Sequence, residues 1–435
     1  MNPVMRILWR CLVAVLFWCA GALAQSQQAA PQRLTLDDCV RLALAAPSTV
    51  RLAQQDRDIA ALGVQAARAG YFPRLQSNSD FNYNSPLVNS PGVPSYVALN
   101  GVREYVFNVQ ATQELDTSGR LRAQVRRARA DHDIAAAGVA ISQRDLKRAV
   151  AAAYYRLLLV RHVAQALRDS LAEAQSFEQR TQKLMEGGQA ARADLVRASA
   201  QAAQFRAAAA AAELEAQVAA HELAAFWTAE VSAPLDVADV FQELQVPEPD
   251  LVPGGSQPVF LQRPEFQLFD AQRRGFLADA RRTKAGLFPQ LNFAFQWGLD
   301  ANQVRWDQRG YAAFFNLTIP IFDWKRTLRE TRQFELRAAQ TDTNRALAQR
   351  VFSRDLQNAY ARERVLYQQI ELARTQARLG EENVRLSRLR FEGGEGSAQD
   401  VVAAQAQLAQ ARTDFYNAIS SYLNARADRE VAAGR

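Results

Sequence analysis

The stretch Arg68–Leu75, which reads RAGYFPRL, recurs as KAGLFPQL at Lys284–Leu291, roughly 210 residues further along the chain. In both stretches a helical pattern stops at glycine and proline, and the alternating pattern of a strand begins. Further landmarks recur in the same order: Pro47 as Pro264, Leu115-Asp116 as Phe322-Asp323, and Met185–Gly188 as Phe391–Gly394. The chain therefore contains two copies of one plan: helix, strand, loop, strand, very long helix, glycine hairpin and long helix.

The N-terminus has the features of a secretory signal. Arg6 and Arg10 precede a short apolar run, and Ala22-Leu23-Ala24 is a small-residue cleavage site, which predicts cleavage after Ala24. A proline-rich stretch separates the two copies and is expected to be a linker or small equatorial segment. The predicted organisation is a signal peptide at 1–24, a first repeat at 25–230, the linker at 231–258 and a second repeat at 259–435.

Each copy carries two segments of about ten residues in which polar and apolar side chains alternate, the period of a strand. The second copy has the clearer pattern, over Leu291–Asp300 and Tyr311–Ile321. A soluble sandwich would have similar strands, but secretion and aromatic enrichment favour a membrane barrel. The polar residues expected to face its lumen are Asn78, Asn108, Gln110, Asn292, Gln296, Asn316 and Thr318.

The rest of each copy is helical. One helix is expected over Leu36–Ala69, and another over Asp116–Met185, where proline is absent and the helix would be roughly 105 Å long. Apolar and small residues recur at steps of three and four from Leu146 to Ala174, and again from Leu366 to Phe391, as in a coiled coil. The expected fold is thus mainly α, with duplicated long helical hairpins plus four strands per protomer.

Four strands cannot close a membrane barrel, because about eight is the smallest common number and unpaired backbone groups cannot face lipid. Several copies must therefore pool their strands, and three copies would give about twelve. The alternative is a periplasmic coiled-coil scaffold protein with a soluble β domain. An outer-membrane enzyme would need a convergent polar site, which the sequence does not contain.

No residue pattern indicates catalysis, a cofactor or a metal ion. His132, His162 and His221 lie in helical segments among charged residues and are expected on solvated helix surfaces. Cys39, the one cysteine left after signal cleavage, is expected to be a small packing residue. The formal net charge of +7 is modest and dispersed, which argues against nucleic acid as a partner.

The sequence resembles the TolC family of outer-membrane efflux proteins over nearly the whole mature chain. The resemblance rests on Leu34–Asp38 and on Arg263-Pro264-Glu265. It rests also on the duplicated order of strand starts, long helices preceded by an aspartate, and glycine hairpins. It implies a homotrimer with a twelve-stranded barrel and a periplasmic α-barrel. It further implies docking on a periplasmic adaptor (membrane fusion) protein and an inner-membrane pump. The exported cargo stays open among drugs, metal ions and polypeptides.

The resemblance also assigns roles at the hairpins. The acidic residue that narrows the periplasmic entrance in the family matches Asp400, while Ala403 occupies the position of a second acid. Asp194 repeats Asp400 in the first copy, and gating and helix capping are both open for the pair. The expected adaptor-contact residues are Gly187, Gly188, Gly393, Gly394 and Ser397.

Overall fold

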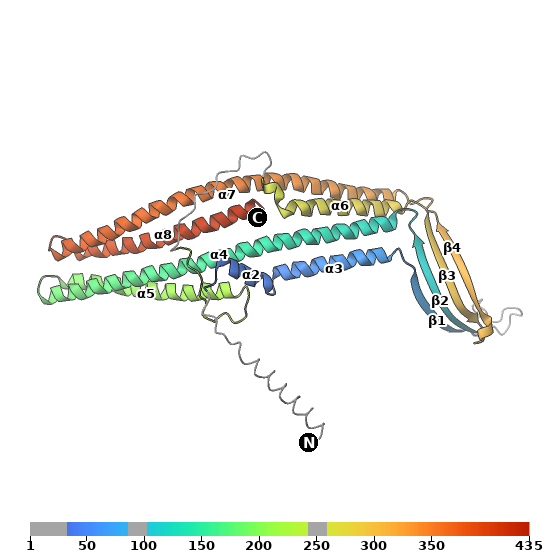
Figure 1. The fold of residues 1–435 in the computed structure, drawn as a ribbon, viewed down its shortest axis with the longest axis horizontal. Coiled ribbons are helices and arrows are strands. Elements are labelled where there is room, and N and C mark those ends of the chain that lie inside the picture. The colour runs from blue at the N-terminus through green and yellow to red at the C-terminus, as the bar shows by residue number, and fades with distance from the viewer. Residues whose placement is uncertain (1–32, 86–101, 242–258, 435) are drawn as a thin grey trace, which may run out of the picture.

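The computed structural model describes residues 33–85, 102–241 and 259–434. The predicted cleavage site at Ala24, the loop between the first two strands and most of the proline-rich linker lie outside these residues. The described chain is an elongated rod of helices with a curved sheet at one end (Figure 1). None of the helices in the described ranges is both long enough and apolar enough to cross a membrane.

Both copies have the predicted order of elements. The first copy comprises α2 (Leu36–Ala45), α3 (Thr49–Ala69), β1 (Arg74–Tyr83), β2 (Arg103–Leu115), α4 (Arg120–Glu186) and α5 (Arg192–Ala224). The second comprises η1 (Val259–Gln262), α6 (Pro264–Ala285), β3 (Gln290–Ala301), η2 (Trp306–Gln308), β4 (Arg309–Thr318), α7 (Arg326–Glu392) and α8 (Ala398–Ala432). Helices α4 and α7 have 67 residues each, or roughly 100 Å of helix, so the duplication preserves their length.

Two predicted boundaries are wrong. The single helix expected over Leu36–Ala69 is broken between α2 and α3, where Ala46 is extended with ψ 163°. Pro47 causes this break, because its ring disfavours helical geometry at the preceding residue and removes a backbone donor. The last strand, expected to reach Ile321, ends at Thr318, since Pro320 cannot donate to a strand ladder.

The four strands form one antiparallel sheet in the order β1-β2-β3-β4. Within the described residues, β1 and β4 are therefore edge strands, each paired on one side only. Next to the sheet, α3, α4, α6 and α7 continue the strands as neighbouring helices in a single layer (Figure 1). Further from the sheet, α4 forms a hairpin with α5, and α7 forms one with α8.

The main hydrophobic core lies midway along the rod. Tyr154 and Leu157 of α4, Leu223 of α5 and Tyr422 of α8 are at most 1% exposed and belong to one cluster. The predicted coiled-coil stripes are confirmed, since Leu146, Val150, Leu157, Ala164 and Ala174 are buried in α4, and Ile370 and Val384 in α7. The described start of the linker joins this core: Val237 forms a bridge with Leu34 and is buried.

Candidate functional site

The strand register brings the predicted lumen residues to one face of the sheet. Residues directly opposite each other in a ladder point to the same side. Asn78 lies opposite Asn108, Gln110 opposite Gln296, and Asn292 opposite Asn316. Thr318 pairs with Gln290 on the same face. The sheet thus has a continuous polar face.

The opposite face is apolar and aromatic. Trp297 lies in one row with Val109 and Tyr311. Phe293 and Phe315 form another pair, with ring centroids 4.9 Å apart. Tyr311 is 78% exposed and Phe315 is 72% exposed in the single protomer. An exposed apolar face of this extent is unusual for a surface in contact with water.

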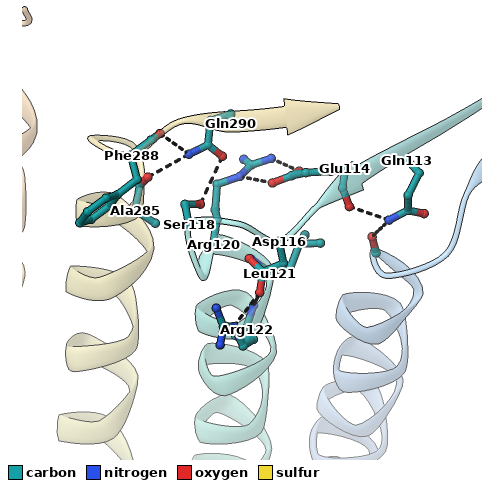
Figure 2. Close-up of polar contacts among 11 residues, drawn as sticks. Gln113, Glu114, Asp116, Ser118, Arg120, Leu121, Arg122, Ala285, Phe288 and Gln290 are labelled. Atoms are coloured by element: carbon teal, nitrogen blue, oxygen red, sulfur yellow. Dashed lines mark hydrogen bonds and ion pairs between the residues drawn. The ribbon is translucent and has the colours of Figure 1, made fainter. Parts of the chain in front are cut away.

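Where the sheet meets the helices, a network of polar contacts holds the turns between strands and helices in place (Figure 2). Asp116 accepts hydrogen bonds from the backbone N–H groups of Leu121 and Arg122, at 3.0 and 3.2 Å, and so caps α4. Gln290 donates to the carbonyl oxygens of Ala285 and Phe288. A hollow of about 980 Å³ lies beside this network on the polar face of the sheet.

The second copy repeats this cap with different residues. Asp323 accepts a hydrogen bond from the Thr327 backbone N–H at 3.0 Å. The Thr327 side chain and this backbone contact hold the pKa of Asp323 below its ordinary value. The residue before α4 is Gly119, with φ 81°, whereas Lys325 before α7 adopts φ 62° without the freedom of glycine. Trp324 is also left-handed, with φ 56°. The strand-to-helix turn of the second copy therefore stores backbone strain.

The glycine hairpins lie at the end of the rod farthest from the sheet (Figure 1). In the first hairpin, Gly188 adopts φ 74° and the Gln189 N–H donates to the Leu184 carbonyl oxygen at 2.8 Å. In the second, Gly394 adopts φ 77° and the Glu395 N–H donates to Arg390 at 2.9 Å. Both helices therefore end in the same glycine-dependent Schellman motif.

The carboxylates after the hairpins cap the helices that follow. Asp400 accepts from the Ser397 N–H at 3.1 Å, and the Ser397 hydroxyl accepts from the Asp400 N–H at 3.2 Å. The pKa of Asp400 is lowered by the hydrogen bonds that its carboxylate accepts from the Ser397 backbone N–H and from the Ser397 hydroxyl. Asp194 accepts from the Ala191 N–H at 3.3 Å, but alanine offers no oxygen to complete a reciprocal box. Capping is thus present in both copies, and it is stronger at Asp400.

Ion pairs that the sequence did not indicate tie the two hairpins together near this end. Arg412 of α8 lies 3.2 Å from Glu173 of α4 and 3.1 Å from Glu381 of α7. Arg180 of α4 pairs with Glu392 at the end of α7, at 2.8 Å. The partners are far apart in sequence and unremarkable individually, so only the packing of three helices identifies them.

The prediction for His162 is wrong. Its side chain is 13% exposed, and its Nε2 lies 2.9 Å from a carboxylate oxygen of Asp239. The imidazole is stacked between the rings of Phe241 and Tyr416, with centroid distances of 5.4 and 4.6 Å. This histidine attaches the described start of the linker to α4 and α8. Cys39 is fully buried, as expected, and burial raises the pKa of its thiol to about 11.

The comparisons with known proteins agree with this architecture. The family model for the outer membrane efflux protein matches residues 39–229 and 257–435. No curated protein is a significant match. The CmeC outer membrane channel of Campylobacter jejuni is 17% identical, with a TM-score of 0.82, and the match covers 92% of this chain and 85% of that one.

Two further solved structures have the same fold. A membrane protein from Pseudomonas aeruginosa is 20% identical, with a TM-score of 0.82 and 92% of each chain covered. The open state of the MtrE outer membrane channel of Neisseria gonorrhoeae is 21% identical, with a TM-score of 0.77, covering 92% of this chain and 88% of that one.

An open two-faced sheet on a rod of duplicated helical hairpins defines the class of outer-membrane channel proteins. The family model covers most of the chain, and the chain belongs to the outer membrane efflux protein family. This confirms the predicted fold class and the predicted function in efflux, and it disfavours a periplasmic scaffold.

Proposed function

We propose that three copies of this chain close one membrane barrel of about twelve strands, continue as a helical tunnel in the periplasm, and act as the outer duct of a multipartite exporter. The observation that carries this proposal is the sheet itself, which is polar on one face, apolar on the other and open at β1 and β4. The polar face lines the lumen, and the apolar face contacts lipid.

The need for assembly follows from the two edges. Backbone N–H and C=O groups on an open edge cost several kcal/mol each in hydrocarbon, so a sheet in a membrane must pair them. β1 and β4 of one chain lie in opposite directions, because three antiparallel pairings separate them. β4 of one protomer can therefore pair with β1 of the next and keep the antiparallel pattern around a closed ring.

The barrel is tested with the full chain in detergent. Light scattering is expected to give the mass of three chains, and the same preparation is expected to conduct ions in a planar bilayer. Cysteines introduced along β1 and β4 are expected to cross-link between chains and not within one chain. A stable monomer, or extraction from membranes by salt alone, would overturn the proposal.

At the opposite end, the hairpin tips are the contact for a periplasmic adaptor and an inner-membrane pump. The geometry of the helices supports this contact. Two helices of 67 residues hold the tips roughly 100 Å from the strands, and both tips end in the same rigid turn. Gly187, Gly188, Gly393 and Gly394 form these turns, and Ser397 begins α8 beside the second. Cross-linking from exposed tip positions to a co-expressed adaptor tests this contact.

Asp400 is proposed to line the periplasmic gate, and Asp194 is proposed to support the gate or cap the facing helix. In a trimer these positions would gather six carboxylates around the entrance, and crowded like charges attract cations. Capping is compatible with this role, since a capping carboxylate still carries its charge. The cargo class is left open, because a wide lumen need not display ligand chemistry.

A further inference from the structure

A small hollow of about 250 Å³ lies where α4 begins and α6 ends, next to the strand-to-helix turns. Its lining contains four cationic side chains: Arg122, Arg126, Arg281 and Lys284. Among the described residues that line it there is no carboxylate, and Phe288 is also part of the lining. Four positive charges around so small a volume form a site for an anion.

These charges are poorly neutralised by the protein. Within the described part of the chain, no carboxylate lies within 4.0 Å of Arg126, Arg281 or Lys284. Arg122 pairs with Asp116 at 2.9 Å, while its own side chain stays 63% exposed. By contrast, Arg127 on the same helix pairs with both Asp131 and Asp279. All four side chains are exposed, so solvent screens part of their mutual repulsion, and an anion bound between them would offset the rest.

The hollow opens on the outside of the tunnel. Arg120 and Gln124 of α4 line the larger hollow on the polar face of the sheet. Arg122 and Arg126 each follow two residues later, which is about 200° around the helix. They therefore lie on the opposite side of α4, the side continuous with the apolar face of the strands.

The height of the hollow along the rod matches a membrane border. Phe288 at its rim is 50% exposed. In the turn between β4 and α7, Phe322 and Trp324 are 69% and 80% exposed, and their ring centroids lie 4.8 Å apart. Exposed aromatic residues at the ends of membrane strands are typical of the level of lipid headgroups.

We propose that Arg122, Arg126, Arg281 and Lys284 bind the phosphate of an anionic phospholipid in the periplasmic leaflet. The inference rests on the proposed barrel, which sets the level of the membrane. The arginine guanidinium groups can donate paired hydrogen bonds to phosphate oxygens, and Lys284 adds a point charge. The acyl chains lie against the neighbouring apolar strands, and Phe288 packs at the junction of headgroup and chain.

The test uses the full-length protein in nanodiscs and compares phosphatidylglycerol with phosphatidylcholine. The triple variant Arg126→Gln, Arg281→Gln and Lys284→Gln removes three charges and leaves Arg122, whose partner caps α4. The matched control, Arg362→Gln, Arg364→Gln and Arg378→Gln, removes three exposed charges from α7, away from the hollow. Native mass spectrometry after detergent transfer counts the phosphatidylglycerol molecules that stay bound.

Wild type and control are expected to retain phosphatidylglycerol in preference to phosphatidylcholine, and the triple variant is expected to bind it roughly a hundredfold more weakly. Equal retention by all three proteins overturns the lipid site. Displacement of the lipid by millimolar inorganic phosphate, with no preference between headgroups, would assign the hollow to free phosphate instead and also overturns it. The mass and conductance of the assembly are measured in parallel, so a failed lipid site with an intact trimer is distinct from a failed barrel.

Discussion

Gly298 of β3 lies directly opposite Asn108 of β2, and the two backbones approach so closely that no side chain fits at residue 298. A Cβ atom there would stand 2.6 Å from the Asn108 Cα and would overlap the Phe107 carbonyl oxygen. Its other neighbour, Gly310 of β4, has open space at the same position. The central pair of strands therefore depends on a glycine that the edge pair does not need.

Gly298→Ala is expected to weaken the β2–β3 pairing by about 1–3 kcal/mol, because the methyl group must displace backbone atoms. Gly310→Ala is the control and is expected to have little effect. Thermal dissociation of the detergent-solubilised assembly, followed by gel mobility, measures both. Equal dissociation temperatures for the two variants would contradict the close approach.

Trp297 and Gln296 are adjacent in sequence but lie on opposite faces of the sheet. Trp297→Arg is expected to impair membrane insertion by roughly 2–4 kcal/mol if the residue lies near the midplane, and Gln296→Arg is expected to be tolerated in an aqueous lumen. The fraction of protein folded in lipid vesicles over a denaturant series measures each cost. Similar costs for the two variants would show that the faces are assigned wrongly.

Gly394 occupies a left-handed conformation, whereas its neighbour Gly393 does not, with φ −79°. Gly394→Val is expected to destabilise the hairpin by about 1–2 kcal/mol and to lower export, while the barrel still inserts. Gly393→Ala is the matched control and is expected to be nearly neutral. Amide hydrogen exchange at the tip and adaptor cross-linking are measured for both variants. Normal cross-linking in Gly394→Val would contradict the proposal that the tip contacts the adaptor.

Asp400 and Ser397 share one cap, so variants of the two residues separate capping from gating. Both Asp400→Ala and Ser397→Ala are expected to loosen the start of α8, but only Asp400→Ala removes a charge from the proposed entrance. Divalent-cation block of single channels should therefore weaken in Asp400→Ala and persist in Ser397→Ala. If divalent-cation block is unchanged in both variants, Asp400 only caps α8 and does not form the gate.

The same cap predicts a pH dependence. The folded-state pKa of Asp400 is lowered below its ordinary value of 3.8, so the ionised carboxylate stabilises the folded hairpin. This contribution is fully present above pH 3.8 and is lost as the pH falls through the lowered folded-state pKa. Amide exchange at the start of α8 should accelerate in that acidic range in wild type and less so in Asp400→Asn.

His162 is stacked between Phe241 and Tyr416 and is bonded to Asp239. His162→Ala is expected to loosen the segment around Val237 by about 1–3 kcal/mol, since it loses both the ring contacts and the charged hydrogen bond. His162→Phe keeps the ring stacking and is therefore expected to lose only part of this stabilisation of the segment around Val237. His221→Ala, at an exposed position on α5, is the control. Amide exchange of residues 234–241 reports the difference.

The sequence by itself determined the features that depend on local periodicity and on turn chemistry. Alternation in Leu291–Asp300 specified a two-faced strand, because successive side chains point to opposite sides. The long proline-free run of α4 and the glycines of both hairpins specified helical rods and tight ends. Duplication strengthened each signal, since the same pattern occurred twice in one order.

Only the tertiary structure decided which distant residues meet. The register that aligns Gln110 with Gln296 and brings Gly298 against Asn108 depends on pairing between the two copies. The burial of His162 depends on a linker segment and a helix that are far away in the sequence. The charged residues next to it in the chain therefore predicted, wrongly, that it would be exposed to solvent. The gathering of Arg126 and Arg281 around one hollow likewise results from the packing of α4 against α6. Local sequence specifies the shape of each element, but contacts between elements depend on interactions distributed over the whole chain, which no local pattern contains.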